Sequence, residues 1–251
     1  MAIDKSQRTA ARVAGFVLLL LMAAAFFSQA YVPSHIIVVD DVAATAHNIV
    51  ASEQLFRIGI AADILIFAGD IVMAVAFYVL LRPVSPGLAM LALLWRTAQS
   101  TIMAMNGLSF LMASSVLSGS GDLRALNGDQ LQELANTYVG AHTAGFNLGL
   151  IFLALGNGVF AYLLFTSNYV PRALAAWGVF AYVVMAVGNL AVIVSGAENS
   201  AGGVMVHYLP AFFFEVIGGG WLLFKGVRAP RRPSPPPYAD EPAGATRDGS
   251  A

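Results

Sequence analysis

The sequence predicts an all-α membrane protein, a polytopic bundle of six transmembrane helices with both termini in the cytoplasm. Three observations support this fold class. The 251 residues are 58% hydrophobic and only 11% charged, whereas soluble domains carry about 25% charged residues. Long apolar stretches recur, each close to the roughly 20 residues that a helix needs to cross a bilayer. Basic residues gather in alternate connections between these stretches.

The apolar stretches predict helices near residues 12–32, 57–81, 88–117, 138–166, 172–194 and 205–226. Residues 1–228 are therefore expected to form one transmembrane domain. Residues 82–87 contain two prolines and a glycine, which end one helix and predict a compact turn before the next. Residues 229–251 are rich in proline and poor in apolar side chains, which predicts a disordered cytoplasmic tail.

Two of the predicted helices have alternative interpretations. The first stretch has a basic start and the small-residue ending Ser28-Gln29-Ala30, so it also resembles a cleavable signal peptide. Its extension to Val32 makes it long enough to span the membrane, which favours a retained helix. Residues 129–138 have helical spacing of apolar side chains, and they form either a short helix on the membrane surface or an extension of the fourth spanning helix.

The direction of threading follows from lysine and arginine in the short connections, because such residues concentrate on the cytoplasmic side. The intervening loops 33–54, 118–136 and 195–204 carry only Arg124. Arg57 is expected at the outer end of the second helix. The cytoplasmic anchors, which lie beside the helix ends on the same side as the basic N-terminus, are Arg82, Arg172, Lys225 and Arg228.

Polar side chains inside the apolar stretches are the candidate functional residues, because a charge at the bilayer centre costs about 2.5–3.5 kcal/mol on insertion scales. At about 1.5 Å per residue, Asp70 lies roughly 16 Å and Arg96 roughly 12 Å from the cytoplasmic ends of two consecutive antiparallel helices. The two side chains are therefore expected to pair. The full candidate set is Asp63, Asp70, Arg96, Glu215, Asn147 and Asn157.

This candidate set allows two interpretations. Three acids and one base on inward faces outline a polar pathway or a proton-titratable site. Alternatively, the acids are structural and are hydrogen-bonded to neighbours such as Gln99, Asn147 and Asn157. The first interpretation favours a protein that handles a small solute, an ion or a proton through its polar interior. The second favours a non-transporting membrane protein that binds lipid or a protein partner, including a second copy of itself.

A membrane enzyme that binds a metal or haem is the third functional class. His142 and His207 lie near the outer ends of two helices at similar depth, and facing histidines can ligate haem or a transition metal. No HExxH motif or comparable pattern accompanies them, so no cofactor is predicted. The chain has no cysteine, which excludes disulfides and thiolate sites. The sequence contains no recognisable pair of nucleophile and base and no basic folded face for nucleic acid.

Several short runs carry a family resemblance. They include Arg12-Val13-Ala14-Gly15, Phe56-Arg57-Ile58-Gly59, Trp95-Arg96, Tyr169-Val170-Pro171-Arg172 and Trp221-Leu222-Leu223-Phe224-Lys225. In this order and spacing, over roughly residues 8–228, the chain resembles the bacterial membrane family filed as domain of unknown function 4386. The resemblance implies a six-helix, multi-pass protein of the bacterial plasma membrane with unassigned activity. It supplies no catalytic residues.

Overall fold

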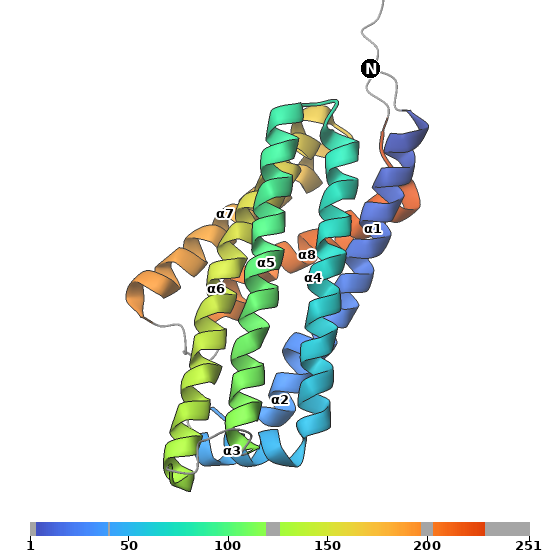
Figure 1. Cartoon of the computed structure of the whole chain (residues 1–251). Coiled ribbons are helices and arrows are strands. Elements are labelled where there is room, and N and C mark those ends of the chain that lie inside the picture. The colour runs from blue at the N-terminus through green and yellow to red at the C-terminus, as the bar shows by residue number, and fades with distance from the viewer. Residues whose placement is uncertain (1–3, 40, 119–125, 197–202, 229–251) are drawn as a thin grey trace, which may run out of the picture.

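The computed structural model describes residues 4–39, 41–118, 126–196 and 203–228, and within them every regular element is a helix. Six of the helical segments are long and apolar enough to cross a membrane (Figure 1). The spanning elements are α1 (Lys5–Ala25), α4 (Glu53–Leu81), α5 (Pro86–Leu117), α6 (Gly128–Ser167), α7 (Arg172–Ser195) and α8 (Gly203–Gly220). The predicted all-α bundle with six apolar spanning helices is confirmed. The predicted tail and Arg124 lie outside the described residues.

The helix boundaries follow their capping residues. Helix α1 begins earlier than predicted because the Asp4 side chain accepts from the Gln7 backbone amide while the Gln7 side chain caps Asp4 in return. Asn127 and Gln130 form the same reciprocal cap at the start of α6. Helix α6 then continues without interruption for 40 residues. The extension predicted as one alternative is therefore present, and the separate surface helix is wrong.

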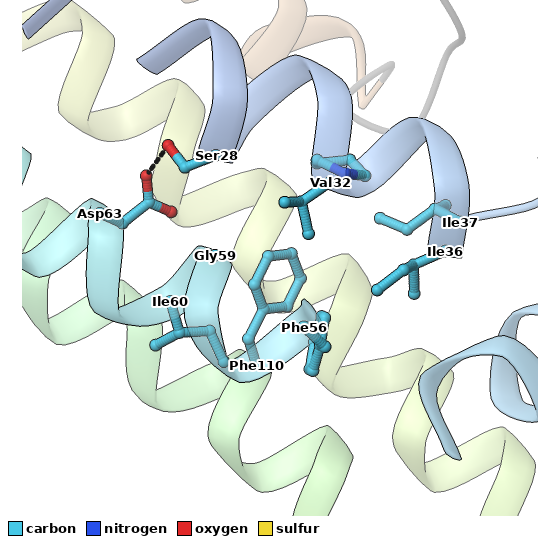
Figure 2. A pocket seen from close by; sticks show the side chains of 10 residues that line it. Ser28, Val32, Ile36, Ile37, Phe56, Gly59, Ile60, Asp63 and Phe110 are labelled. Atoms are coloured by element: carbon cyan, nitrogen blue, oxygen red, sulfur yellow. Dashed lines mark hydrogen bonds between the residues drawn. The ribbon is translucent and has the colours of Figure 1, made fainter. Parts of the chain in front are cut away.

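The first spanning segment changes its helical pitch near its end. Helix α1 continues into a π-helical turn, η1 (Phe26–Tyr31), and then into α2 (Val32–Ile36). The π-turn inserts one extra residue per turn, and it places Ser28 against Asp63 of α4 (Figure 2). A second π-helical turn, η2 (Trp221–Lys225), follows α8 directly. The chain stays helical through the three glycines at the end of α8, which are Gly218, Gly219 and Gly220.

Helix α3 (Val42–Ala51) was not predicted from the apolar pattern. It starts at Asp41, whose carboxylate accepts from the Ala44 backbone amide. Figure 1 shows α3 lying across the end of the bundle beside the start of α4. This end of the molecule is called the α3 end below.

The spanning helices form a closed ring of neighbours. Each packs against the next along the chain, and α8 closes the ring by packing against α1. Gly15 allows this closure, since a Cβ atom there would lie 2.6 Å from the Gly219 carbonyl oxygen. In this structure the first segment packs as part of the bundle, between α4 and α8.

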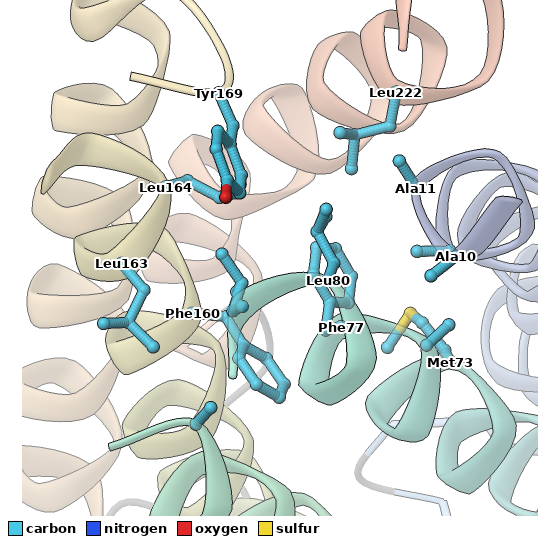
Figure 3. Close-up of a cluster of buried hydrophobic side chains, with 14 of the residues drawn as sticks. Ala10, Ala11, Met73, Phe77, Leu80, Phe160, Leu163, Leu164, Tyr169 and Leu222 are labelled. Atoms are coloured by element: carbon cyan, nitrogen blue, oxygen red, sulfur yellow. The ribbon is translucent and has the colours of Figure 1, made fainter. Parts of the chain in front are cut away.

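Both ends of the described chain meet at the opposite end of the bundle. Gln7 donates to the Leu80 carbonyl at 3.2 Å and to the Tyr169 hydroxyl at 3.1 Å. The Arg228 amide donates to the Tyr169 carbonyl at 2.9 Å. Figure 3 shows the apolar cluster beneath this junction, where Leu80, Tyr169 and Leu222 come together. We call this the basic end, because Arg82, Arg172, Lys225 and Arg228 lie in the segments that meet there.

Candidate functional site

The ion pair between Asp70 and Arg96 lies in the interior of the bundle. The turn after Leu81 and the proline at the start of α5 hold α4 and α5 antiparallel. Arg96 Nη2 donates to Asp70 Oδ1 at 2.6 Å, and Gln99 Nε2 lies 3.4 Å from Asp70 Oδ2. Arg96 is 1% exposed and Asp70 is 8% exposed. The contact predicted from helix depth is present.

Arg96 is only partly satisfied by this pair. Its Nε and Nη1 atoms are buried and have no hydrogen-bond partner among the described residues. The aliphatic part of the side chain packs against α6 at Gly156, where a Cβ atom would lie 2.8 Å from Arg96 Cγ. The guanidinium is therefore held between α5 and α6 with two of its nitrogen atoms unused.

Glu215 forms the centre of a second group of hydrogen bonds. The Tyr182 hydroxyl donates to Glu215 Oε1 at 2.8 Å, and the Tyr208 hydroxyl donates to Oε2 at 3.1 Å. Asn157 Nδ2 donates to the Tyr182 hydroxyl at 3.0 Å and lies 3.4 Å from Glu215 Oε1. Glu215 is 5% exposed, and the hydrogen-bond partners of its carboxyl group are all neutral.

The two groups are neighbours through α6. Gly156 contacts Arg96, and the next residue, Asn157, contacts Glu215. Arg96 and Glu215 also interact electrostatically. We call the combined set, drawn from five helices, the central polar cluster: Asp70, Arg96, Gln99, Asn157, Tyr182, Tyr208 and Glu215.

Tyr182 and Tyr208 were not among the predicted site residues. A tyrosine in an apolar helix usually packs its ring in the core or at the membrane interface, so the residue type gave no distinct signal. The one available indication was spacing, since Tyr182, Met185 and Asn189 share the buried face of α7. The hydroxyl groups of Tyr182 and Tyr208 both hydrogen-bond to the Glu215 carboxyl group.

Asn147 lies outside the central polar cluster. It is 0% exposed, and both polar atoms of its amide lack a partner among the described residues. The suggestion that it hydrogen-bonds one of the buried acids is therefore wrong. Its position on α6 is ten residues before Asn157, about 15 Å along the helix, which separates it from Glu215.

Asp63 forms a separate site. Ser28 Oγ donates to Asp63 Oδ1 at 2.7 Å, and Gln29 Nε2 donates to the same oxygen at 3.2 Å. Asp63 and Asp70 were expected to face one pathway because they are seven residues apart. Their side chains contact different elements, because Asp63 is hydrogen-bonded to Ser28 of η1 whereas Asp70 is hydrogen-bonded to Arg96 of α5. The three acids therefore do not line one continuous site.

The two candidate metal-binding histidines contact different helices. The His142 ring stacks on Phe110 of α5, with 3.5 Å between ring centroids. The His207 side chain lies against Gly188 of α7. In the part of the chain that the structure describes, no three histidine, aspartate or glutamate side chains are grouped as a metal site. The packing of these histidines gives the haem or metal hypothesis no support.

The predicted anchors lie at both ends of the bundle. Arg57 pairs with Glu53 at 2.8 Å on the surface of α4, near the α3 end. The Arg228 guanidinium lies 4.9 Å from the centre of the Trp221 ring at the basic end. These contacts are compatible with residues at membrane interfaces, where long basic and aromatic side chains are common.

Comparison with known proteins identifies one family. The model of the family described as "Domain of unknown function (DUF4386)" matches residues 13–226. Searches of curated proteins and of solved structures returned no match. The matched region contains every residue of the central polar cluster, and the family description assigns no activity to it.

Proposed function

Because the chain belongs to the DUF4386 family, whose description names no activity, we propose its function from the site alone: the central polar cluster exchanges a proton during transport across the membrane. The observation that carries this proposal is the composition of the cluster. It holds one guanidinium and two carboxyl groups, all of them buried.

Charge balance explains why a proton belongs in this cluster. Arginine stays protonated in proteins, so two ionised carboxylates would leave one uncompensated negative charge in a low-dielectric interior. Such a charge is costly there. One bound proton makes the cluster neutral. Asp70 already has the cation at 2.6 Å, so Glu215 is the carboxyl that carries the proton.

The hydrogen bonds around Glu215 suit both protonation states. A hydroxyl group can donate or accept by rotating about its C–O bond. The Tyr208 hydroxyl, 3.1 Å from Oε2, donates to the carboxylate and accepts from the carboxylic acid. The Tyr182 hydroxyl accepts from Asn157 and donates to Oε1, so it keeps the carboxyl in place. A proton can therefore bind or leave without unpacking the helices.

Arg96 provides the response to proton loss. Its Nε and Nη1 atoms have no hydrogen-bond partner among the described residues. Its Cγ and Cδ atoms pack on Gly156, and the next residue, Asn157, contacts Glu215. When Glu215 is ionised, both carboxylates attract the same guanidinium. A shift of Arg96 toward Glu215 would change the contact between α5 and α4, and this supplies a link between proton binding and helix movement.

Proteoliposomes with an internal pH-sensitive dye test the proposal. A pH gradient or an imposed potential should drive proton flux in the wild-type protein, and Glu215→Gln should reduce that flux at least about tenfold. Glu53→Gln is the matched control, because Glu53 lies on the surface of α4 in an exposed ion pair. Gel filtration and circular dichroism establish that both variants are folded.

Two results would contradict the proposal. Flux through the wild-type protein that does not exceed that of empty liposomes would reject it, and so would equal flux through Glu215→Gln. The first result, combined with loss of stability when Arg96 or Asp70 is changed, would favour the non-transporting alternative. In that alternative the buried charges fix the packing of a lipid- or partner-binding protein.

A further inference from the structure

The chain folds back on itself directly after the last spanning helix. The turn η2 closes with a hydrogen bond from the Gly226 amide to the Trp221 carbonyl at 3.0 Å. Gly226 then has a φ of 67°, which residues with a Cβ atom rarely adopt. The guanidinium of Arg228 comes to lie 4.9 Å from the centre of the Trp221 ring. The Arg228 amide donates to the Tyr169 carbonyl at 2.9 Å, which holds the backbone in this position.

Lys225 lies on the same face of η2 as Trp221. A π-helical turn places residues four to five positions apart on one side, and Lys225 follows Trp221 by four. Both Lys225 and Arg228 are exposed. In the described part of the chain neither side chain has a carboxylate within ion-pairing distance, whereas Arg57 is paired with Glu53. This face of η2 therefore presents two unpaired cations beside an aromatic ring.

The charge around this face favours an anion. The basic residues described at this end of the bundle are Lys5, Arg8, Arg12, Arg82, Arg172, Lys225 and Arg228, and the acid described among them is Asp4. An excess of one sign of charge raises the local concentration of the opposite sign.

An exposed apolar ridge leads along α8 to the two cations. Phe213, Ile217, Trp221 and Lys225 follow one another at intervals of four residues, so their side chains lie in one row along the helix. Phe213 is 53% exposed and Ile217 is 56% exposed. The row from Phe213 to Trp221 extends about 12 Å along the helix axis. This length is close to the depth of one lipid leaflet, which is about 15 Å of hydrocarbon.

We propose that this ridge binds an anionic phospholipid, with the phosphate between Lys225 and Arg228 and an acyl chain along Phe213 and Ile217. A guanidinium group can donate two parallel hydrogen bonds to a phosphate, and an ammonium group adds a compact charge. The Trp221 ring suits the boundary between acyl chains and headgroups. A phospholipid supplies both the negative charge and the apolar chain, whereas a free phosphate supplies only the charge. The site lies outside the central polar cluster and does not depend on proton transport.

Quenching of tryptophan fluorescence by brominated lipids tests this site, because Trp221 lies in it. The purified protein is reconstituted into phosphatidylcholine bilayers with increasing fractions of brominated phosphatidylglycerol or, in parallel, brominated phosphatidylcholine. Brominated phosphatidylglycerol should reach half-maximal quenching at a mole fraction about tenfold lower, since each basic residue near the membrane surface contributes about fivefold. Trp221→Phe should lose the additional quenching by phosphatidylglycerol.

Charge-neutralising variants locate the phosphate. Lys225→Gln and Arg228→Gln should each reduce the preference for phosphatidylglycerol by roughly fivefold. Arg82→Gln is the matched control, because it removes one charge from the same end of the bundle but lies on the turn after α4. It should keep the wild-type preference, and so should Glu215→Gln, which separates this test from that of proton flux. Circular dichroism establishes that the variants are folded.

Four results would overturn the proposal. The first is equal quenching of the wild-type protein by the two brominated lipids. The second is an effect of Arg82→Gln as large as that of Arg228→Gln, because the attraction would then come from the charge of the whole end. The third is displacement of brominated phosphatidylglycerol by inorganic phosphate, which would assign the face to a soluble anion. The fourth is an unchanged preference in Lys225→Gln, which decides the matter if Arg228→Gln does not fold.

Discussion

Arg96 binds Asp70 through a single guanidinium nitrogen at 2.6 Å, while two further nitrogens of the same side chain stay buried without a partner. A buried arginine paired only for stability would be expected to use its fork on both carboxylate oxygens. Here the second oxygen of Asp70 faces Gln99 instead. The ion pair is therefore held by one hydrogen bond, and the Nε and Nη1 donors of Arg96 remain without a partner among the described residues.

Replacing Arg96 by leucine should destabilise the protein by about 3–5 kcal/mol, because Asp70 would keep a buried charge without its cation. The double variant Arg96→Leu with Asp70→Leu should recover a large part of this loss, since neither charge remains. Thermal unfolding in detergent, followed by circular dichroism, measures both. Single variants as stable as the wild type would show that the ion pair does not contribute to folding.

The surface ion pair provides the comparison for this measurement. Arg57 and Glu53 are four residues apart on one helix and lie 2.8 Å from each other, but both are well exposed. Exposed pairs contribute about 0–1 kcal/mol. Arg57→Leu should therefore change the midpoint of thermal unfolding much less than Arg96→Leu does.

Gly156→Ala should displace Arg96 and destabilise the protein by about 1–3 kcal/mol. The added Cβ would lie 2.8 Å from Arg96 Cγ and 3.1 Å from the Ala92 carbonyl oxygen, so either the arginine or α5 must move. Gly158→Ala is the matched control, since its Cβ meets Tyr182 Cβ at an ordinary 3.5 Å. Equal thermal stability of the two variants would contradict the packing of Arg96 on α6.

Tyr182→Phe should cost about 1–3 kcal/mol of stability, because it removes the closest donor to a buried carboxyl and the acceptor for Asn157. Tyr162→Phe is the control, since Tyr162 is 48% exposed, and its effect should lie within about 0.5 kcal/mol. Chemical or thermal unfolding of the two variants under identical detergent conditions decides the matter. A Tyr182→Phe protein that is no less stable than Tyr162→Phe would reject the role of this hydroxyl.

The Asp70–Arg96 contact could be predicted from the sequence because the two residues lie on helices that are consecutive in the chain. A short turn joins α4 to α5, so counting residues from that turn fixes the depth of each side chain. Glu215 and Asn157 are 58 residues apart, and α7 lies between their helices in the chain. Their contact depends on helix rotation and tilt, which apolar composition does not encode.

Local irregularities of the helices could not be predicted from the apolar pattern either. The π-turn η1 inserts one residue without any distinctive composition, yet it determines that Ser28 and Gln29 face Asp63. Helix α3 is too short to span a membrane and depends on the Asp41 cap. For these reasons the six spans were predictable, whereas the hydrogen bonds of Asp63 and the tyrosine partners of Glu215 were not.

Gly15→Ala should loosen the contact that closes the ring and lower stability by about 1–3 kcal/mol. Its Cβ would meet two backbone atoms, the Gly219 oxygen at 2.6 Å and the Leu223 nitrogen at 2.7 Å, so the helices must separate. Gly220→Ala has no atom within 4 Å and should be neutral or slightly stabilising, as alanine is favoured over glycine in helices. Thermal unfolding compares the stability of the two variants.

N-terminal sequencing of the wild-type protein should find α1 retained. A mature protein that starts after Ala30 would contradict this expectation and also the contact between Gly15 and Gly219.

Cysteine labelling should place the basic end in the cytoplasm, as expected from the distribution of lysine and arginine. The chain has no native cysteine, so single cysteines report without background. Ser6 is an exposed residue at the basic end, and Val39 is 58% exposed next to α3. On intact cells a membrane-impermeant maleimide should label Val39→Cys and leave Ser6→Cys unmodified until the membrane is permeabilised. Labelling of Ser6→Cys in intact cells would reverse the orientation, and Glu215 would then face its proton supply from the other side.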